Sequence, residues 1–579
     1  MALAFALAAY WFWAFPYRCA LSFHEQYQLF LTTGDYFIER TGVPGGFASW
    51  MAELLTQFYY KPVFGALVPA AMSVALQALT WLLAQVNGAK WAAYPLSFIT
   101  PLALWAYMGD ENVMLAFGLS LVAALGAMLL LSHNAHWCNC PLWIKATAVA
   151  VGLPVFHWLF GPSVLIVAAY VAFNERHGMR LHKLSSFIVA AMALIVTIAC
   201  INACTLVVPF PLSRLYRGLE YYRYPVYDPS AQYAIMATAT VLPLLMPLLR
   251  DSRRSLLVGL ACLAASAYAA FHVMGFDRGK YDVIDYDFLV RTEQWEKIIG
   301  KAEHQQPETP LEVAALNLAL SQKGQLAERL FDFYQNGTEG LLPSFSRNMT
   351  TPVFTGEAFF RLGMVNDAHR HFFEAQEAIP NFRKSGRLTK RIVECEMANG
   401  NFAVAAYYLR MMSNTLYYKP WAMRMMRMLK SPADVARHPL IRRMRACRYT
   451  KADYLFSDTE MDQMLGLLFT CNNGNCMAYE YLMCHTLLNR DVEKFMRYYP
   501  LGQHAGYSRI PRSFQEVLVG VWLQRHGNLR SMPYSVDAKT AGETVEFLRI
   551  YTSESDRHQL DLPPYCHNVW HYITKTSEE

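Results

Sequence analysis

Charged side chains are scarce in the first half of this 579-residue chain. Residues 1 to about 275 are nearly all apolar, and most of the Asp, Glu, Lys and Arg lie beyond residue 277. Over the whole chain only 17% of residues are charged, the net charge is +6, and no long basic run occurs. This pattern argues against nucleic acid as a partner. It predicts a membrane half followed by a water-soluble half.

Recognisable catalytic motifs are absent from the second half, which has no nucleotide-binding loop, no Ser-His-Asp order and no pair of CxxC motifs. We therefore expect no catalysis there. Cysteines are also few, at 12 in the chain, and Cys200, Cys204 and Cys262 lie in apolar runs, where we interpret them as small core residues. Cys471 and Cys476 flank a Gly turn; they either pair in an oxidising compartment or stay unlinked.

One segment gathers side chains that bind metals: SHNAHWCNC, with His133, His136, Cys138 and Cys140. Imidazole and thiolate groups are zinc ligands, but this spacing matches no zinc-ligand pattern. We therefore predict no metal site from the sequence.

Apolar runs predict about nine membrane spans, each near the roughly 20 residues that a bilayer requires. The first, Met1 to about Tyr17, has no basic residue ahead of it and is followed by Arg18, so we interpret it as a span rather than a signal peptide. The two runs around Gly161-Pro162 are short, and they form either half-spans or one bent helix. The eight predicted spans after the first lie at about 62–85, 91–108, 113–132, 142–159, 161–174, 185–209, 230–249 and 255–274.

Basic residues in short connectors predict the orientation of these spans. The denser set marks the cytoplasmic face: Lys90, Arg176, Arg180, Lys183, Arg250, Arg253 and Arg254. The long first loop 18–61, the 109–112 connector, the 210–228 loop and the C-terminal half then share the outer face. That face is the periplasm in a bacterium and the ER lumen in a eukaryote. We expect a bacterial inner-membrane protein with its C-terminal domain in the periplasm.

The first loop carries the candidate catalytic acid. Glu25 lies beside His24, a few residues past the first apolar run. Burial at the water–lipid boundary raises the pKa of such a carboxyl group and makes it a usable base. The rest of the loop is rich in aromatic residues and predicts two interfacial helices, 26–39 and 46–59, broken at Pro44. The alternative interpretation is a re-entrant or surface-lying connector.

Two further polar segments are expected on the same face. Asp110-Glu111 forms a tight acidic connector, and the loop PLSRLYRGLEYYRYPVY carries Arg214, Arg217 and Arg223. Carboxylates facing arginines suit a reaction in which guanidinium groups hold the phosphate of a lipid donor. The alternatives are arginines that snorkel to lipid headgroups and an acidic turn that is merely solvated.

The second half predicts a stack of helical repeats. Segment 356–380 resembles the second-helix signature of a tetratricopeptide repeat at Gly363, Ala368, Phe372, Ala375 and Pro380. Small residues let two helices pack closely, and the aromatic residue fills the groove to the next pair. Such a stack offers a face to a protein or peptide partner. The aromatic stretch 407–430 is the expected contact surface, unless it is ordinary core with a solvated face.

The predicted fold class is thus all-α, with a polytopic transmembrane domain, 1–275, and a soluble tetratricopeptide-like helical domain, 281–579. This layout resembles the GT-C superfamily of integral-membrane glycosyltransferases, in particular members with a tetratricopeptide-like tail on the outer side. The resemblance implies a sugar or glycan donor on a polyprenyl phosphate or diphosphate in the membrane lipid, and transfer at the outer face to a protein or glycan acceptor. It leaves a divalent metal ion open as a cofactor.

Carried over to this chain, the resemblance puts Glu25 in the place of the catalytic acid, and Asp110 and Glu111 in the second acidic motif. Arg214 and Arg217 are then expected to bind the donor phosphate, and Arg223 and His24 complete the predicted binding residues. Many members have two acids where this chain has His24-Glu25, and Asp35 is a rival for the base.

Two other function classes remain alternatives. A membrane-anchored helical scaffold that gathers envelope proteins needs neither Glu25 nor Asp110. A lipid or small-molecule transporter is less favoured, because the spans carry few charges and no inverted pair of broken helices is evident.

Overall fold

The computed structural model describes residues 1–133, 140–178, 183–223, 230–273, 277–450, 459–504, 507–553 and 557–575. Within these ranges the chain is all-helical, and an isolated antiparallel bridge between Val113 and Tyr222 is the one extended pairing. The all-α fold class predicted from the sequence is confirmed.

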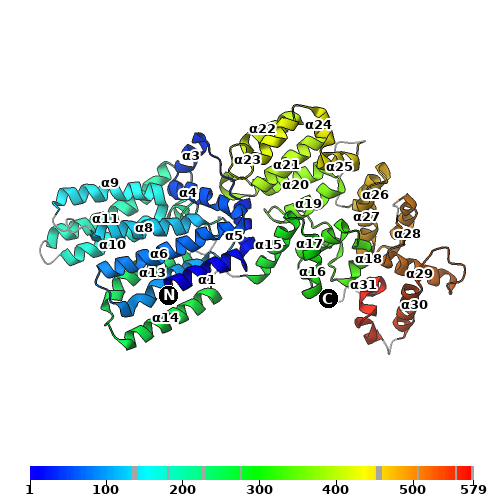
Figure 1. Cartoon of the computed structure of the whole chain (residues 1–579), viewed down its shortest axis with the longest axis horizontal. Helices are drawn as coiled ribbons and strands as arrows, with labels where there is room; N and C mark the ends of the chain where they lie inside the picture. The colour runs from blue at the N-terminus through cyan, green and yellow to red at the C-terminus, as the bar shows by residue number, and fades with distance from the viewer. Residues whose placement is uncertain are drawn as a thin grey trace. The chain divides into compact units, whose positions relative to one another are not determined.

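The chain divides into two compact units, whose helices are labelled in Figure 1. Unit 1 comprises Met1–Tyr281 together with two segments from far along the sequence, Ile379–Gly386 and Met411–Trp421. Unit 2 comprises Asp282–Ala378, Arg387–Arg410 and Ala422–Glu579. Two stretches of the C-terminal half therefore pack with the membrane half, and both contribute to the candidate site.

Unit 1 is built around long apolar helices that lie side by side (Figure 1). Their core is aliphatic and aromatic. The long helices are α6 (Leu67–Val86), α8 (Leu115–His133), α9 (Leu142–Phe160), α10 (Val164–Gly178), α11 (Lys183–Ala203), α13 (Ser230–Leu245) and α14 (Arg253–Val273). Shorter helices are α1 (Ala2–Ala14), α5 (Pro62–Gly65), α7 (Ile99–Tyr107) and α12 (Leu212–Arg217).

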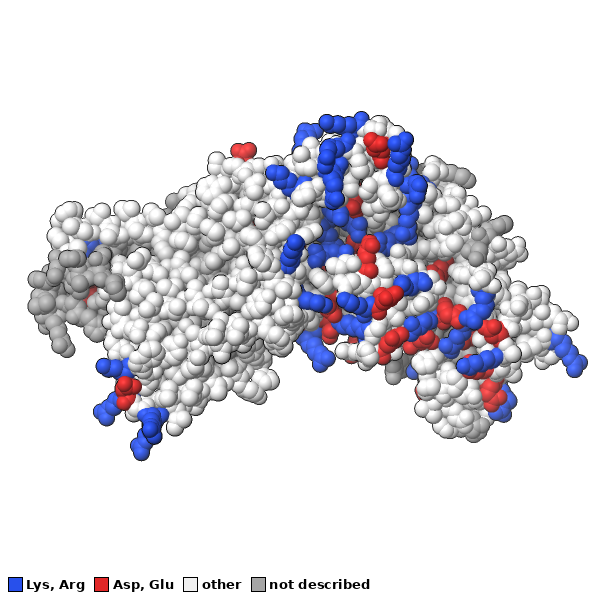
Figure 2. All heavy atoms as spheres, in the orientation of Figure 1, with Lys and Arg blue, Asp and Glu red and all other residues white. Residues whose placement is uncertain are grey.

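Six stretches among the described residues are long and apolar enough to cross a membrane. They are Pro62–Val86, Leu115–Ser132, Leu142–Glu175, Leu184–Leu206, Ser230–Leu248 and Arg253–His272. Figure 2 shows few charged side chains on the visible face of these helices and many over unit 2. This distribution is consistent with an integral membrane protein, because charged groups are costly in a bilayer interior.

Three features separate these six stretches from the nine spans predicted. α1 has only 13 residues. The run at 91–108 forms a 3₁₀ segment, Trp91–Phe98, before α7, because Pro95 lacks the backbone donor that an α-helix needs. The runs 142–159 and 161–174 fall within one apolar stretch.

That stretch is a hairpin of α9 and α10. The ammonium group of Lys145, near the start of α9, lies 2.9 Å from the carboxylate of Glu175, near the end of α10. Both side chains are buried. Because the start of one helix touches the end of the next, the chain reverses at Gly161–Ser163, and the pair is not one bent helix. Sequence inspection missed this ion pair between two membrane helices.

Loops that the basic residues assign to one face meet at one end of the helices. Hydrogen bonds join them: Tyr17 Oη to Gly109 O, Gly45 N to Trp158 O, Arg223 N to Asn112 O, and Tyr221 Oη to Phe160 O. The 87–91 and 249–252 connectors lie together elsewhere in unit 1, where the Ala92 amide donates to Asp251 at 3.3 Å. Distant parts of the sequence are thus brought to a common layer beside the helix ends.

The first loop folds into α2 (Arg18–Gln26), α3 (Gly34–Thr41), α4 (Gly46–Thr56) and a 3₁₀ turn, Gln57–Tyr60. A helix over 26–39 was expected, but residues between α2 and α3 are extended: the Leu29 amide donates to Lys384 O and the Thr32 amide to Asn414 O, each at 2.9 Å. The predicted break at Pro44 is confirmed. Gly45, at φ 80°, takes the left-handed conformation that precedes α4.

Unit 2 consists of successive helical hairpins, coloured green to red in Figure 1. Its helices, some of which share end residues with unit 1, are α15 (Arg278–Arg291), α16 (Trp295–His304), α17 (Pro310–Gln322), α18 (Leu326–Arg329), α19 (Thr351–Leu362), α20 (Val365–Glu377), α21 (Gly386–Asn399), α22 (Phe402–Met412), α23 (Lys419–Met428), α24 (Pro432–Arg437), α25 (Pro439–Cys447), α26 (Met461–Cys471), α27 (Cys476–Leu488), α28 (Val492–Tyr498), α29 (Arg512–His526), α30 (Ala538–Thr552) and α31 (Val569–Thr574).

The predicted repeat motif coincides with the α19–α20 hairpin. Gly363 ends α19 at φ 90°, and a Cβ there would lie 2.7 Å from the backbone of Cys447. Ala368, Phe372 and Ala375 are fully buried. Three residues of the motif are thus core residues of the hairpin, and Gly363 lets the end of α19 approach α25 closely.

A buried ion cluster lies beside this hairpin. The Glu357 carboxylate, on α19, is fully buried and lies 3.0 Å from Arg391, 3.3 Å from Arg387 and 3.7 Å from Arg361. Burial opposes its ionisation, but the three guanidinium groups outweigh that cost and lower the pKa of Glu357 to about 2. The cluster joins α19 to α21, so it stabilises unit 2 only while the carboxyl group is charged.

Candidate functional site

Glu25, the predicted catalytic acid, lies near the end of α2 and is 1% exposed. The Tyr418 hydroxyl, from the 411–421 segment of unit 1, donates to Glu25 Oε1 at 3.1 Å. Tyr418 also packs edge-on against Tyr60 of the first loop. The acid is therefore covered by an aromatic side chain that comes from almost 400 residues further along the chain.

The second acidic motif forms a tight turn after α7. Asp110 Oδ1 accepts from the Asn112 amide at 2.9 Å, and Asp110 Oδ2 accepts from the Tyr222 hydroxyl at 2.5 Å. Glu111 lies 3.5 Å from Lys280. Burial and the neighbouring Asp110 raise the pKa of Glu111, against the opposing charge of Lys280. The turn is thus a structured carboxylate pair rather than a freely solvated connector.

Arg223 links this turn to α2. Its backbone amide donates to Asn112 O at 2.8 Å. Its guanidinium group lies over the rings of Phe23 and Tyr27, at 5.0 and 4.7 Å from their centroids, on either side of His24-Glu25 in sequence. Burial and the charge of Arg223 lower the pKa of His24 to about 3, so the imidazole is neutral at physiological pH. One arginine therefore lies beside both acidic motifs.

The other two predicted arginines lie elsewhere. Arg214, on α12, donates to Asn381 Oδ1 at 3.1 Å and lies over the ring of Phe210. Arg217 ends α12, where its carbonyl accepts from Gln232. Of the three arginines in this loop, Arg223 is the one for which the described residues show a contact with α2.

Sequence reasoning missed a second buried polar cluster nearby. Glu53 on α4 and Glu220 share the guanidinium group of Arg383, which lies 2.9 Å from Glu53 and donates to Glu220 and to Ser49. Arg40 lies 3.5 Å from Glu53, and the Tyr36 hydroxyl donates to the same carboxylate. Burial raises the pKa of Glu220, and Arg383 opposes that shift.

This cluster fixes the 379–386 segment against the first loop. Asn381 donates to both Leu219 O and Glu220, at 3.2 and 3.3 Å. Single acids such as Glu53 gave no signal in the sequence, apart from being charged positions within apolar stretches, which are buried only when paired.

An apolar groove opens on the membrane helices beside the same loop. It has a volume of about 440 Å³ and is lined by α4, the 57–65 turn, α6 and α8, including Leu55, Phe58, Phe64, Leu67 and Leu119. Phe58 also contacts Tyr417, the neighbour of Tyr418, with ring centroids 6.4 Å apart. A much smaller cavity, of about 10 Å³, lies against His24 and Gln28. That volume suits roughly one water molecule.

Chemically, this layer supplies a buried carboxylate, a neutral imidazole, a paired acidic turn and one guanidinium group. Such groups can accept a proton and hold an anionic phosphate. The adjoining groove can hold a hydrocarbon chain.

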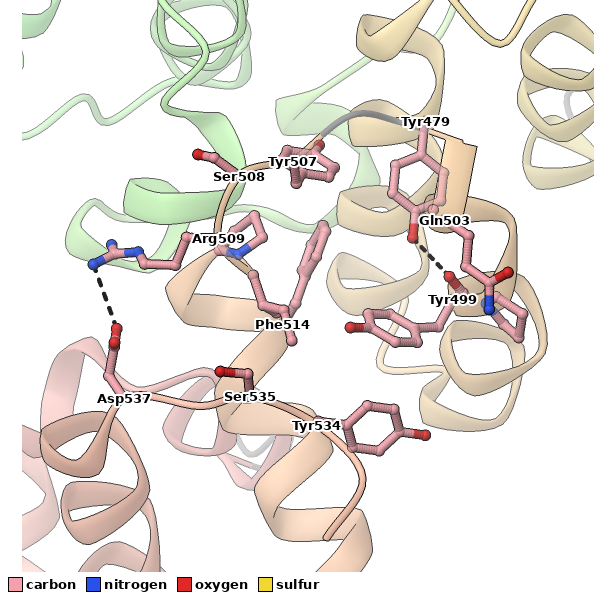
Figure 3. Close-up of a pocket in the computed structure, with 14 residues that line it drawn as sticks. Tyr479, Tyr499, Gln503, Tyr507, Ser508, Arg509, Phe514, Tyr534, Ser535 and Asp537 are labelled. Carbon is pink, nitrogen blue, oxygen red and sulfur yellow. Dashed lines mark hydrogen bonds and ion pairs between the residues drawn. The ribbon is translucent and has the colours of Figure 1, made fainter.

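Unit 2 holds a separate pocket with different chemistry (Figure 3). It has a volume of about 430 Å³. The rings of Tyr479, Tyr499, Phe514 and Tyr534 surround it, and Arg509 lies 3.4 Å from Asp537 at one edge. Aromatic faces interleaved with hydrogen-bonding groups suit a peptide segment or a sugar ring.

Other predicted contact and cysteine positions are placed as follows. Tyr417 and Tyr418 pack against the first loop, whereas Tyr407 is exposed on α22. Cys471 and Cys476 are both free thiols. His136 and Cys138, from the segment that gathers metal-binding side chains, lie outside the described residues.

Comparison with known proteins gave one relationship. No curated protein and no solved structure matched the chain. A family model covers residues 1–576, nearly the whole length. The chain therefore belongs to the DUF6057 family, a family of unknown function.

Proposed function

We propose that this protein is an outer-face membrane glycosyltransferase, which moves a sugar or glycan from a polyprenyl-phosphate-type lipid to a protein or glycan acceptor. The observation that supports this proposal most strongly is the position of Arg223: its backbone is bonded to the acidic turn at 110–112, and its guanidinium group lies over Phe23 and Tyr27 of α2, the helix that carries Glu25. Acid–base groups and a phosphate-binding cation are the two requirements of this transfer.

In the proposed reaction, the Glu25 carboxylate takes the proton of an acceptor hydroxyl group. The hydroxyl oxygen forms a bond to the anomeric carbon of the donor. The bond from that carbon to the phosphate oxygen breaks, and its electron pair leaves with the lipid phosphate. Arg223 binds that phosphate. Asp110 and Glu111 supply the second pair of carboxyl groups of the proposed site. Arg214 is bound to Asn381 and is assigned a structural role.

The apolar groove is the proposed binding site of the polyprenyl chain. Its lining is almost wholly apolar, and Leu67 and Phe64 are half exposed on the membrane-helix surface. A path of contacting rings leads from the groove to the acid: Phe58, Tyr417, Tyr60 and Tyr418. The polyprenyl chain of the donor would lie in the groove, in contact with membrane lipid, and the phosphate of the donor would be directed towards α2.

The proposal requires the site to open. Glu25 is 1% exposed beneath Tyr418, and the cavity near His24 has room for about one water molecule. Movement of the 411–421 segment would break the bond from Tyr418 to Glu25 and admit the donor head group. Closure over bound substrate would then exclude water from the reaction.

The proposed topology has nine crossings. α1, the 91–107 segment and both helices of the α9–α10 hairpin count as crossings in addition to the longer helices. The amino terminus then lies in the cytoplasm of a bacterial inner membrane. The first loop, the 109–112 turn, the 210–223 loop and the tetratricopeptide-like unit 2 lie on the periplasmic side.

A transfer assay in vesicles tests the proposal. Protein is reconstituted with a panel of radiolabelled polyprenyl-phosphate and polyprenyl-diphosphate sugars and an envelope extract as acceptor, and release of the lipid phosphate is measured. Glu25→Gln should lower the rate at least about 100-fold, the usual loss for a general base. The matched control is Glu39→Gln, an exposed acid in the same loop. Full transfer by Glu25→Gln rules out the proposed role.

A second candidate function is a non-catalytic scaffold for envelope protein assembly. The aromatic pocket of unit 2 favours it, because its rings and polar groups suit a peptide. On this alternative, Tyr534→Ala abolishes the function in cells and Glu25→Gln has no effect. The glycosyltransferase proposal predicts that Glu25→Gln abolishes it.

A further inference from the structure

Three side chains with metal-binding atoms converge where α9 and α11 pack together. They are His157 on α9, Cys200 on α11, and Cys204, which begins the 3₁₀ turn after α11. One ligand atom from each lies within 4.8 Å of the other two. Cys200 and Cys204 are four residues apart, a spacing that places both thiols on one helix face. This group is separate from the acidic layer described above.

The imidazole of His157 points to a missing partner. His157 is 1% exposed, and within the described part of the chain neither ring nitrogen makes a hydrogen bond of good geometry; the Gly161 backbone is the polar group that approaches the ring. Leaving a buried polar group unpaired costs free energy, so such groups normally bond to protein, water or a metal. The two thiols also lie within 4.8 Å of the ring, and a thiol is a weak hydrogen-bond partner but, as a thiolate, a strong metal ligand.

The geometry points to a Zn²⁺ site held by His157, Cys200 and Cys204. Tetrahedral zinc takes thiolate and imidazole ligands at about 2.0–2.3 Å, so small side-chain movements would bring the three atoms into coordination. Two thiolates balance the charge of Zn²⁺ and leave a neutral centre, which suits apolar surroundings. Cu⁺ with the same ligands would carry a net negative charge, which is costly to bury.

The site lies near the helix ends rather than in mid-membrane. His157 is three residues before the end of α9, and Cys204 follows the last residue of α11. The neighbouring Trp158 indole donates to Thr41 O in the first loop, so this end of α9 faces the loop layer. Three protein ligands leave the fourth position open to water or to a ligand oxygen.

Metal content tests the site directly. The full chain is purified in detergent, incubated with ZnSO₄, freed of excess metal and analysed by elemental mass spectrometry. About one Zn²⁺ per chain is expected for the wild type and for Cys262→Ser, a matched thiol control in α14. Cys200→Ser and Cys204→Ser should each lose most of it. Equal zinc in all four proteins, or copper in place of zinc, overturns the proposal.

A second measurement covers variants that fail to fold. Wild-type protein is alkylated with and without ZnSO₄, and each cysteine is followed by peptide mass spectrometry. Zinc should slow alkylation of Cys200 and Cys204 at least about 10-fold, because a coordinated thiolate is protected, and should leave Cys262 unchanged. Co²⁺ in place of Zn²⁺ should give a thiolate-to-metal charge-transfer band. Unprotected thiols and no such band contradict the site.

Discussion

Arg383 is the residue whose replacement most sharply tests the packing of the 379–386 segment into unit 1. Its guanidinium group is 5% exposed and serves two buried carboxylates, Glu53 and Glu220. In Arg383→Met, Arg40 still pairs with Glu53 at 3.5 Å, so buried Glu220 loses its ion-pair partner and keeps the hydrogen bond from Asn381 and the more distant charge of Arg40. Removing one partner of a buried ion pair costs about 3–5 kcal/mol.

That cost should appear as local opening of the segment. The Leu29 amide donates to Lys384 O, next to Arg383, so its hydrogen exchange reports whether the segment is bound. Since about 1.4 kcal/mol is tenfold in an equilibrium constant, exchange at Leu29 should accelerate more than about 100-fold in Arg383→Met. Peptide-resolved hydrogen exchange of the detergent-solubilised protein measures it.

A double variant separates charge from packing. Arg383→Met combined with Glu220→Gln removes both members of the pair and leaves Arg40 with Glu53, so most of the lost protection should return. Arg424→Ala, an exposed arginine on α23, should change nothing. Exchange at Leu29 that stays within about threefold of wild type in the single variant would refute the buried-charge reasoning.

Two further predictions concern unit 2: alkylation of its fully buried Cys395 at neutral pH measures opening for the first, and urea unfolding followed by tryptophan fluorescence measures stability for the second. Gly363→Ala should lower the free energy of opening by about 2–5 kcal/mol, because alanine is strained in the left-handed conformation and its Cβ would meet Cys447. Gly527→Ala, at φ 70° with no neighbouring atom in the way, should lower it by only about 1–2 kcal/mol. Equal losses in the two variants would contradict the close approach to Cys447. The pKa of Glu357 falls from 4.5 to about 2 on folding, so the charged carboxylate stabilises unit 2 above pH 4.5, and this stabilisation is lost as pH falls towards 2. Roughly 3 kcal/mol of unfolding free energy should disappear over that range. Glu357→Gln should abolish this dependence of stability on pH.

Composition and periodicity predicted the broad architecture. Uninterrupted apolar runs identify α6, α8, α11, α13 and α14 because a membrane helix needs a continuous apolar length and no distant partner. Prolines explain why the 91–108 run forms a shorter helix than expected. The buried positions Ala368, Phe372 and Ala375 of the α19–α20 hairpin were also predicted, since they lie close together in sequence.

The candidate site could be predicted only in part from the sequence, because it depends on contacts between distant segments. Glu25 and the acidic turn at 110–111 stand out locally, and the nine spans predicted from the sequence would place them on one face. Tyr418, which covers Glu25, and Arg383, which pairs with the neighbouring acids Glu53 and Glu220, come from segments that are hundreds of residues away and look like ordinary repeat sequence. Which of three nearby arginines contacts α2 depends on the turn after α12, and spacing alone does not reveal it.

The zinc ligands illustrate the same limit. In the sequence, Cys200 and Cys204 look like small core residues of one apolar helix. The structure adds His157 from another helix, and the proposal of a metal site depends on that third residue. No sequence spacing links them, because the α9–α11 packing is a tertiary contact.

The most direct measurement is electron cryomicroscopy of the protein in lipid nanodiscs with a polyprenyl-phosphate sugar analogue whose glycosidic bond cannot break. We expect the hydrocarbon chain in the groove lined by Phe58 and Leu67, and the phosphate within hydrogen-bonding distance of Arg223, with Tyr418 moved away from Glu25. A head group bound elsewhere, or a bound lipid that leaves Glu25 covered, would contradict the proposed glycosyltransferase site.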